Sequence, residues 1–452
     1  MTTQVTAKHR DAARPKVKWL RLIPWTWFVA CFVLAAVGLL LLVARTSIQP
    51  IDYQGYQKAV DGLNRGEGPY QRPEQCRQLW RGIHQAEVFV VTGGKMGALP
   101  PAQPGPYLYP PTLALLIQRL HTGAPFFICL LLGAVLGFGW LWLRAAQASP
   151  WWLLLISGSW DVVATFLSGN AEHLQLFLTL AAAWLLWKRR GVWAAPLIAL
   201  AVLIKPYYAL FFVAFGLLLL VTDAPQRRAH VRALALAAGL ALLLAVLDIA
   251  TWGAVARAAA LDYFRHAMDY QWWPLPVAEQ TPMSLWNRSP MQGLVMLGLP
   301  AATAQLASQV LWLALLAVSL WRCRGRRLGF PMLFALAFVL LYLGRPVGWN
   351  YVYLDVVLLV ALQPVLRRTT LALLLTAAIA LSLTHWWALI LTGRGVWLNF
   401  FTLQTASLPW ETWTVLPACW LLLVGLGCRG NTPQEQEVRD QKSEVSRQQQ
   451  KS

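Results

Sequence analysis

Long apolar runs dominate the chain, and short polar or basic segments separate them. Apolar runs of about 20 residues are typical of membrane-spanning helices, because a helix satisfies its own backbone hydrogen bonds in lipid. We therefore predict an all-α, polytopic membrane protein with about twelve crossings and both chain ends in the cytoplasm. The expected crossings are 23–44, 125–143, 151–167, 171–187, 192–221 (crossing twice), 233–252, 303–320, 328–343, 351–366, 371–391 and 412–427.

Residues 107–120 are apolar but short, and Pro110-Pro111 opens them. If they crossed the membrane, every later loop would change sides and the basic run Lys188 to Arg190 would lie outside. We therefore interpret 107–120 as a helix that lies at the outer membrane interface.

Residues 192–221 lie between two basic clusters that should both be cytoplasmic, so we expect this run to cross twice. The pair Lys205-Pro206 then divides it into two short helices, whose tip faces outward or lies part-way into the membrane. One long kinked helix is the alternative.

The composition supports this class, since 58% of the 452 residues are hydrophobic and only 13% are charged. A net charge of +19 would suggest a nucleic-acid partner in a soluble chain. Here the basic residues lie mainly in short segments between apolar runs, so they report topology and we expect no nucleic acid. We divide the chain into a basic leader (1–22), a transmembrane domain (23–428) with outer loops at 45–120 and 253–302, and a disordered cytoplasmic tail (429–452).

Asp52 is the first candidate for chemistry, because it follows the first span on the expected outer face. A carboxylate there can accept a proton from a hydroxyl group that attacks an activated carbon. Tyr53 and Tyr56 indicate an ordered, aromatic loop around it. A solvated loop aspartate is the alternative.

Lys205 lies between two apolar half-helices, with no acidic residue near it in the sequence. A lysine buried in a membrane is costly, so we expect it to meet an anion, for example a lipid phosphate. A lysine that reaches toward the headgroups is the alternative.

Further polar residues fall in the other expected outer turns. Asn170, Glu172 and His173 could orient an acceptor, or Asn170 could cap the next helix. The loop 253–302 is rich in aromatic rings, which suit a sugar or a prenyl chain, although an aromatic belt explains many of them. Arg288 in that loop, and Arg345 near Trp349 in the next, offer guanidinium groups for a phosphate.

No zinc-type spacing, phosphate-binding glycine loop or nucleophile elbow occurs in the sequence. A nucleotide-sugar site of the soluble type is therefore not supported, and we expect neither a metal nor a cofactor. A lipid-linked donor, already activated by its phosphate, needs only a carboxylate and a phosphate clamp.

Seven short motifs give the chain a family resemblance from Trp25 to Tyr353. They are Asp52-Tyr53 with Tyr56 and Ala59, Gly68-Pro69-Tyr70, Tyr109-Pro110-Pro111, Gly169-Asn170, Ile204-Lys205-Pro206-Tyr207, Trp286-Asn287-Arg288-Ser289 and Trp349-Asn350-Tyr351. In this order they resemble the polyprenyl-phosphate-sugar-dependent mannosyltransferases of glycosyltransferase family 87, in the GT-C superfamily. The chain differs in an extended stretch at 72–106 and in reading Asn-Arg-Ser where Asn-Gln-Ser is expected.

The resemblance implies a GT-C-like bundle in the inner (plasma) membrane, with its active site on the extracytoplasmic face. It implies metal-independent, inverting transfer of a hexose, mannose first, from a polyprenyl-phosphate sugar to a glycan or glycolipid, with Asp52 as general base. The expected substrate-binding residues are Tyr53, Tyr56, Tyr109, Asn170, Glu172, His173, Lys205, Asn287, Arg288, Arg345 and Trp349.

Other functions remain open from the sequence. A pentosyltransferase of the same fold, such as an arabinofuranosyltransferase, is one alternative, and a transporter or flippase of a lipid-linked sugar is another. A carrier would more often show paired broken helices in two related halves, whereas this chain has one large, asymmetric outer loop. A polymerase or ligase of surface polysaccharide would place its functional residues in a late loop.

Overall fold

Every regular element in the described part of the chain is a helix. The computed structural model describes residues 26–37, 51–70, 107, 109–121, 123–153, 169–222, 226–265, 289–326, 328–345, 356, 359–360, 362–363 and 410–425. The helices are Thr26–Val37, α2 (Ile51–Asn64), α4 (Pro111–Leu120), α5 (Ala124–Ala145), α8 (Glu172–Trp187), α9 (Gly191–Ile204), α10 (Tyr208–Thr222), α11 (Arg227–Thr251), α12 (Ala254–Arg265), α14 (Pro290–Met296), α15 (Ala301–Cys323), α16 (Phe330–Gly344) and α20 (Trp410–Gly425).

Among the described residues, three helices are long and apolar enough to cross a membrane: Pro125–Ala145, Arg227–Thr251 and Ala302–Cys323. All three expose large apolar side chains, such as Phe126 on α5 (59% exposed), Leu242 on α11 (67%) and Trp321 on α15 (71%). Such surfaces are a liability in water but suit contact with lipid tails. The chain is thus a multi-pass membrane protein by the length and composition of its helices, while the count of twelve crossings stays a prediction. The expected crossing 371–391 lies outside the described residues, and so do most of the expected crossings 151–167 and 351–366.

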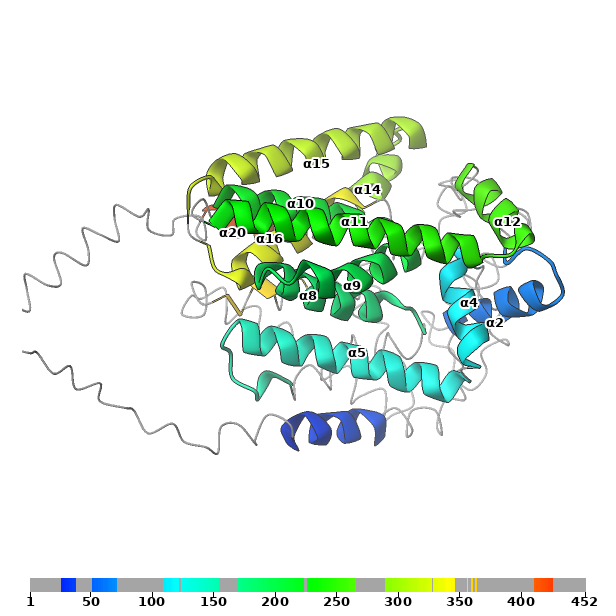
Figure 1. The fold of residues 1–452 in the computed structure, drawn as a ribbon. Helices are drawn as coiled ribbons and strands as arrows, with labels where there is room; N and C mark the ends of the chain where they lie inside the picture. Colours follow the sequence, from blue (N-terminus) through cyan, green and yellow to red (C-terminus); the bar gives the residue numbers. More distant parts are fainter. Residues whose placement is uncertain are drawn as a thin grey trace, which may run out of the picture.

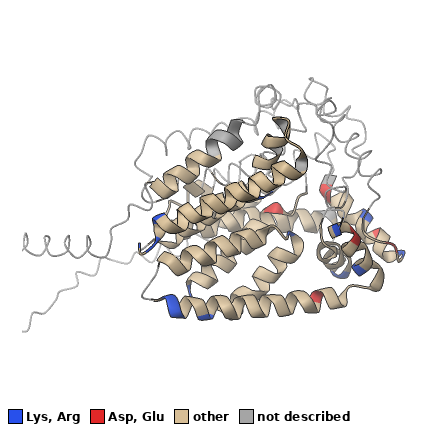
Figure 2. Ribbon diagram, turned by 90° about the horizontal axis from the view of Figure 1, so that it is seen from above, with Lys and Arg blue, Asp and Glu red and all other residues tan. Residues whose placement is uncertain are grey.

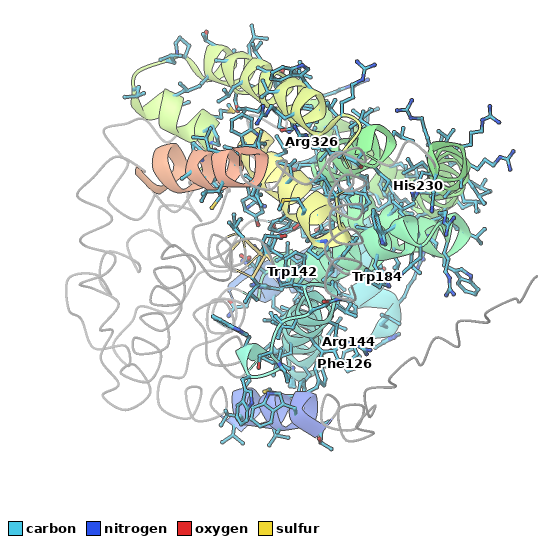
Figure 3. All side chains as sticks on the ribbon, turned by 90° about the vertical axis from the view of Figure 1, so that its left-hand side faces the viewer. Phe126, Trp142, Arg144, Trp184, His230 and Arg326 are labelled. Carbon is cyan, nitrogen blue, oxygen red and sulfur yellow. The ribbon has the colours of Figure 1, made fainter. Side chains whose placement is uncertain are left out.

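The long helices run side by side, and α2, α4 and α12 gather at one end of the bundle (Figure 1). The interior is apolar along most of its length: Trp142 of α5 is fully buried, whereas Phe126 on the same helix is 59% exposed (Figure 3). α16 is the most enclosed helix, since its side chains from Met332 to Leu343 are all buried. The bundle therefore has a central element that can hold polar groups away from lipid and water.

The other end of the bundle is basic. The turns after α8, α10 and α15 meet there, because Gly325 donates its backbone N–H to the carbonyl of Val221 at 2.9 Å and the Nε of Arg227 donates to the carbonyl of Leu220 at 2.9 Å. Figure 2 shows Lys and Arg at this end of the long helices, and charges of both signs at the opposite end. The residues of this basic end are Lys188, Arg189, Arg190, Arg227, Arg228, Arg232, Arg322, Arg324 and Arg326.

The stretch that contains Asp52 is helical, so the prediction of a loop there was wrong. Tyr53, Tyr56, Ala59 and Val60 are all buried, and their spacing repeats about once per helical turn. Asp52 lies in the first turn, where a negative charge is favourable. The aromatic residues that suggested an ordered loop in fact form the buried face of α2.

The predicted break at Lys205-Pro206 is confirmed, and the alternative of one long helix is wrong. α9 ends at Ile204, and Lys205 has extended backbone angles (φ −137°, ψ 97°). Pro206 lacks the N–H that a continuing helix would need. α9 and α10 have 14 and 15 residues, or about 21–23 Å each, which is shorter than a hydrocarbon core of about 30 Å.

α9 and α10 form a helical hairpin whose tip is the break at Lys205-Pro206. The start of α9 and the end of α10, which lie away from this tip, pack close to the first turns of α11. A Cβ added to Gly191 would lie 2.2 Å from the carbonyl oxygen of Ala233, and the contact between Arg227 and Leu220 holds the end of α10 close by. The tip at Lys205 therefore points away from the basic end, as the sequence predicted.

The close approach of α9 to α11 predicts the effect of a small substitution. Gly191→Ala should lower stability by about 1–3 kcal/mol, because a backbone carbonyl cannot move aside as a flexible side chain can. Gly239→Ala is the matched control, since an added Cβ on that exposed α11 residue meets nothing within 4 Å. The free energy of unfolding of each variant and of the parent, measured in mixed micelles, gives the difference. Equal stability of the two variants would contradict this contact.

Candidate functional site

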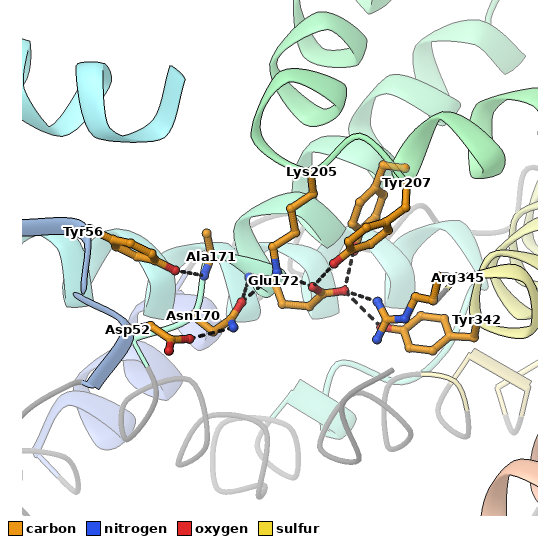
Figure 4. A network of polar contacts seen from close by, with 10 residues as sticks. Asp52, Tyr56, Asn170, Ala171, Glu172, Lys205, Tyr207, Tyr342 and Arg345 are labelled. Atoms are coloured by element: carbon orange, nitrogen blue, oxygen red, sulfur yellow. Dashed lines mark hydrogen bonds and ion pairs between the residues drawn. The ribbon is translucent and has the colours of Figure 1, made fainter. Parts of the chain in front are cut away.

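A polar network lies where α8 begins and where α9 and α16 end (Figure 4). α16 begins at the basic end, since Phe330 packs against Trp184 of the last turn of α8 at 4.9 Å between ring centroids. Its C-terminal end, followed by Arg345, therefore reaches the opposite end of the bundle, as do the start of α8 and the hairpin tip. We call these residues the Glu172 network: Asp52, Asn170, Glu172, Lys205, Tyr207, Tyr208, Tyr342 and Arg345.

Asn170 joins α2 to the hairpin tip. Its Nδ2 donates to Oδ2 of Asp52 at 2.7 Å, and its Oδ1 accepts from Nζ of Lys205 at 2.8 Å. The same oxygen accepts the backbone N–H of Glu172, the first residue of α8, at 2.9 Å. The N-cap of α8 is Ala171, which makes no side-chain cap, so Asn170 bonds this N–H from one residue before the cap and is not the N-cap that the sequence predicted. With donors on one side and an acceptor on the other, the amide has only one orientation that satisfies all three bonds.

Glu172 is fully buried and accepts five hydrogen bonds. Lys205 Nζ (2.6 Å) and Tyr207 OH (2.9 Å) donate to Oε2. Arg345 Nη1 (2.5 Å), Tyr208 OH (2.9 Å) and Tyr342 OH (3.3 Å) donate to Oε1. The anion that Lys205 meets is thus supplied by the chain itself, where the sequence had suggested a lipid phosphate.

Arg345 is fully buried and only partly paired. Its guanidinium carbon lies 3.7 Å from the ring centroid of Tyr342 and 5.5 Å from that of Tyr207. Nη1 bonds Glu172, but Nε and Nη2 find no hydrogen-bond partner in the described structure. Buried donors without partners are rare because the lost hydration costs free energy. Arg345 therefore presents one edge of its planar group without an acceptor.

Asp52 is only partly exposed, at the border between this network and its surroundings. Burial raises the pKa of Asp52 to about 6, while the charge of Lys205 and the hydrogen bond from Asn170 lower it. The carboxylate is therefore mostly ionised at neutral pH and can still accept a proton, which is the condition that suits a general base.

A cluster of tyrosine rings begins at Tyr56, which lies one helical turn after Asp52 on α2 and interacts electrostatically with it. Tyr56 packs edge-on against Tyr109 at 5.2 Å and accepts the backbone N–H of Ala171 at 3.3 Å. Burial raises the pKa of Tyr56 well above its ordinary value, so its hydroxyl stays neutral. Tyr70 stacks on Tyr263 of α12 at 4.6 Å, and this contact joins the segment that follows α2 to α12.

The structure brings together most of the residues that the sequence predicted. Asp52, Asn170, Glu172, Lys205 and Arg345 share one network, with Tyr56 and Tyr109 beside it. Tyr53 instead packs against Phe127 at 5.2 Å on the buried face of α2, and His173 is buried one residue after Glu172. Asn287, Arg288 and Trp349 lie outside the described residues, so their roles stay predictions.

Sequence reasoning gave no site role to three tyrosines that bond Glu172, although Tyr207 belongs to one of the family motifs. Tyr207 and Tyr208 directly follow the Lys205-Pro206 break, and Tyr342 lies about one helical turn before Arg345. Their positions beside the two cations were the available signal. In the described residues, no group of three or more His, Cys, Asp or Glu side chains is placed to hold a metal ion.

Comparison with known proteins gives one match. The family model described as Glycosyltransferase family 87 matches residues 107–346, which is just over half of the chain. No curated protein and no solved structure matches. The matched region begins at Tyr107, so it contains Asn170, Glu172, Lys205 and Arg345, whereas Asp52 precedes it.

Proposed function

The chain belongs to glycosyltransferase family 87, and from this premise we propose that it transfers a hexose from a polyprenyl-phosphate sugar to a hydroxyl group of a glycan or glycolipid. Membership of the family makes the protein a glycosyltransferase. The choice of mannose as the sugar, of a polyprenyl-phosphate donor and of an inverting mechanism comes from what the family resemblance implies.

Asp52 acts as the general base in this proposal. The acceptor hydroxyl loses its proton to a carboxylate oxygen of Asp52 as its own oxygen forms a bond to the anomeric carbon. The bond from that carbon to the phosphate oxygen breaks, and its electron pair leaves with the polyprenyl phosphate. Because attack and departure occur on opposite faces of the sugar, the anomeric configuration inverts. Activity should therefore fall as the pH falls through about 6, where Asp52 becomes protonated.

One observation carries the proposal: a single amide, that of Asn170, bridges Asp52 and Lys205. Only the amide of Asn170 lies between the Asp52 carboxylate and the Lys205 ammonium group, although 153 positions separate the two residues in the sequence (205 − 52). A cation held near a buried carboxylate favours its ionised form, which is the form that a general base needs before it takes a proton.

Arg345 supplies the phosphate contact in this scheme. Its Nε and Nη2, which have no hydrogen-bond partner among the described residues, form the kind of two-donor edge that binds phosphate oxygens in pairs. Lys205 has a different role from the one first expected, since Glu172 already neutralises it. It orients Asn170, and through Asn170 it orients Asp52.

The distribution of charge supports an extracytoplasmic site. The basic end of the bundle gathers the turns after α8, α10 and α15, and such clusters favour the cytoplasmic side. The Glu172 network lies at the opposite ends of α8, α9 and α16. We accordingly place the reaction on the outer side of the inner (plasma) membrane.

The test of this function uses the full chain, purified and reconstituted in lipid nanodiscs. Labelled polyprenyl-phosphate mannose should pass its sugar to a glycolipid acceptor and release one polyprenyl phosphate for each sugar transferred. Labelled GDP-mannose should give no product. Movement of the intact lipid-linked sugar across vesicle membranes, without transfer, would instead support the flippase alternative.

A further inference from the structure

We propose that Glu172 is a positioning residue: without contacting Asp52, it sets the proton affinity of Asp52 through Lys205 and Asn170. This inference rests on the proposed role of Asp52 and adds to it, since the sequence had placed Glu172 among the substrate-binding residues. Its five hydrogen-bond donors leave little room for a substrate group on either carboxylate oxygen.

A continuous chain of polar contacts joins the two carboxylates. Glu172 Oε2 holds Lys205 Nζ at 2.6 Å, and Lys205 holds Asn170 Oδ1 at 2.8 Å. The other end of that amide donates to Asp52 at 2.7 Å. Every side chain between the two carboxylates is at least 96% buried, so water screens the charges only weakly.

Charge balance gives the direction of the effect. Lys205 and Arg345 carry two positive charges, and Glu172 carries one negative charge. The remaining positive charge favours the ionised form of Asp52, whose charge makes the sum zero. From the elements packed around it, the titratable groups that face Asp52 or this pair are Tyr56 of α2, Tyr107 and Tyr109, Glu172 of α8, Lys205, Tyr207 and Tyr208 at the hairpin, and Tyr342 and Arg345 at the end of α16.

Substitutions that change this sum should move the titration of Asp52 in opposite directions. Glu172→Gln leaves two uncompensated positive charges, so the pKa of Asp52 should fall by about one unit. Arg345→Met leaves a neutral pair, so the pKa should rise by about one unit. The double variant Glu172→Gln/Arg345→Met restores the original sum and should titrate close to the parent.

The experiment titrates the infrared carbonyl band of the protonated Asp52 carboxyl in detergent-solubilised full chain. The band is assigned by its loss in Asp52→Asn, and Glu67→Gln is the control because Glu67 is an exposed glutamate paired only with Arg65 on the surface. The rate of sugar transfer is also measured across pH. The pH at which this rate falls on the acid side should shift together with the titration midpoint of the infrared band. If Glu172→Gln alone does not fold, Arg345→Met and the double variant still differ by the Glu172 charge alone.

Opposite shifts in the two single variants and a restored midpoint in the double variant are the expected result. Unchanged midpoints, or shifts of both single variants in the same direction, would overturn the inference. If Glu172 and Arg345 had only a structural role, either substitution would loosen the site and move the Asp52 midpoint in the same direction. If the midpoints shift as expected but no sugar transfer is found, the electrostatic link stands and the proposed function fails. If transfer occurs and the midpoints do not move, this inference alone fails.

Discussion

Sugar transfer by the Asp52→Asn variant is expected to fall about 10²- to 10⁴-fold, the usual contribution of a general base. Asparagine keeps the shape of the side chain, and its carbonyl oxygen can still accept the hydrogen bond from Asn170. It cannot, however, take up the proton of the acceptor hydroxyl. Initial rates of transfer from labelled polyprenyl-phosphate mannose, at saturating acceptor, measure the loss.

Asp61→Asn is the matched control for that experiment. Asp61 lies on the same helix, α2, and is exposed, so the same change of charge occurs away from the network. Both variants should keep the thermal stability of the parent in detergent. Near-normal turnover in Asp52→Asn would remove the catalytic role assigned to this carboxylate.

The helical framework was largely predictable from the sequence because its signals are local. Apolar runs located α5, α8, α15 and α16 within a few residues, and the Lys205-Pro206 pair located the break in the hairpin. Pro206 lacks a backbone N–H, and Lys205 places a charge in an apolar run. Both effects interrupt a helix locally, independently of the rest of the fold. α2 was missed because its buried aromatic face was interpreted as the wall of a loop.

The partners within the site could not be predicted in the same way. Glu172 and Lys205 are 33 positions apart, and Glu172 and Arg345 are 173 apart. Their pairing depends on the start of α8 meeting the ends of α9 and α16, which is a property of packing. The sequence could indicate that Lys205 needs an anion, but it could not indicate that the chain supplies one.

Asn170→Asp is expected to have the second large effect, and it tests the bridge with almost no change in shape. The carboxylate of aspartate can still accept from Lys205 and from the N–H of Glu172. What changes is the contact with Asp52, where a donor becomes a second carboxylate. Two carboxylates at that distance cannot both ionise readily, so they share one proton.

The sign of this effect follows from the pKa of Asp52, which is about 6 in the parent. A neighbouring negative charge raises the pKa of a carboxyl group, typically by about one to three units. The acid limb of kcat/KM should therefore move upward by that amount, so transfer at neutral pH should fall by about twofold for a rise of one unit and about 90-fold for a rise of three, and it should recover at alkaline pH. A misfolded protein would lose activity at every pH, which separates the two explanations.

Asn64→Asp provides the control, since Asn64 is an exposed amide at the end of α2 that bonds Gln118 away from the network. Its pH profile should match that of the parent. An Asn170→Asp profile with the acid limb still near pH 6 would show that Asp52 does not titrate in the active enzyme. The hydrogen bond from Asn170 would then serve the fold and not the reaction, and the base would have to be another group within reach of the acceptor.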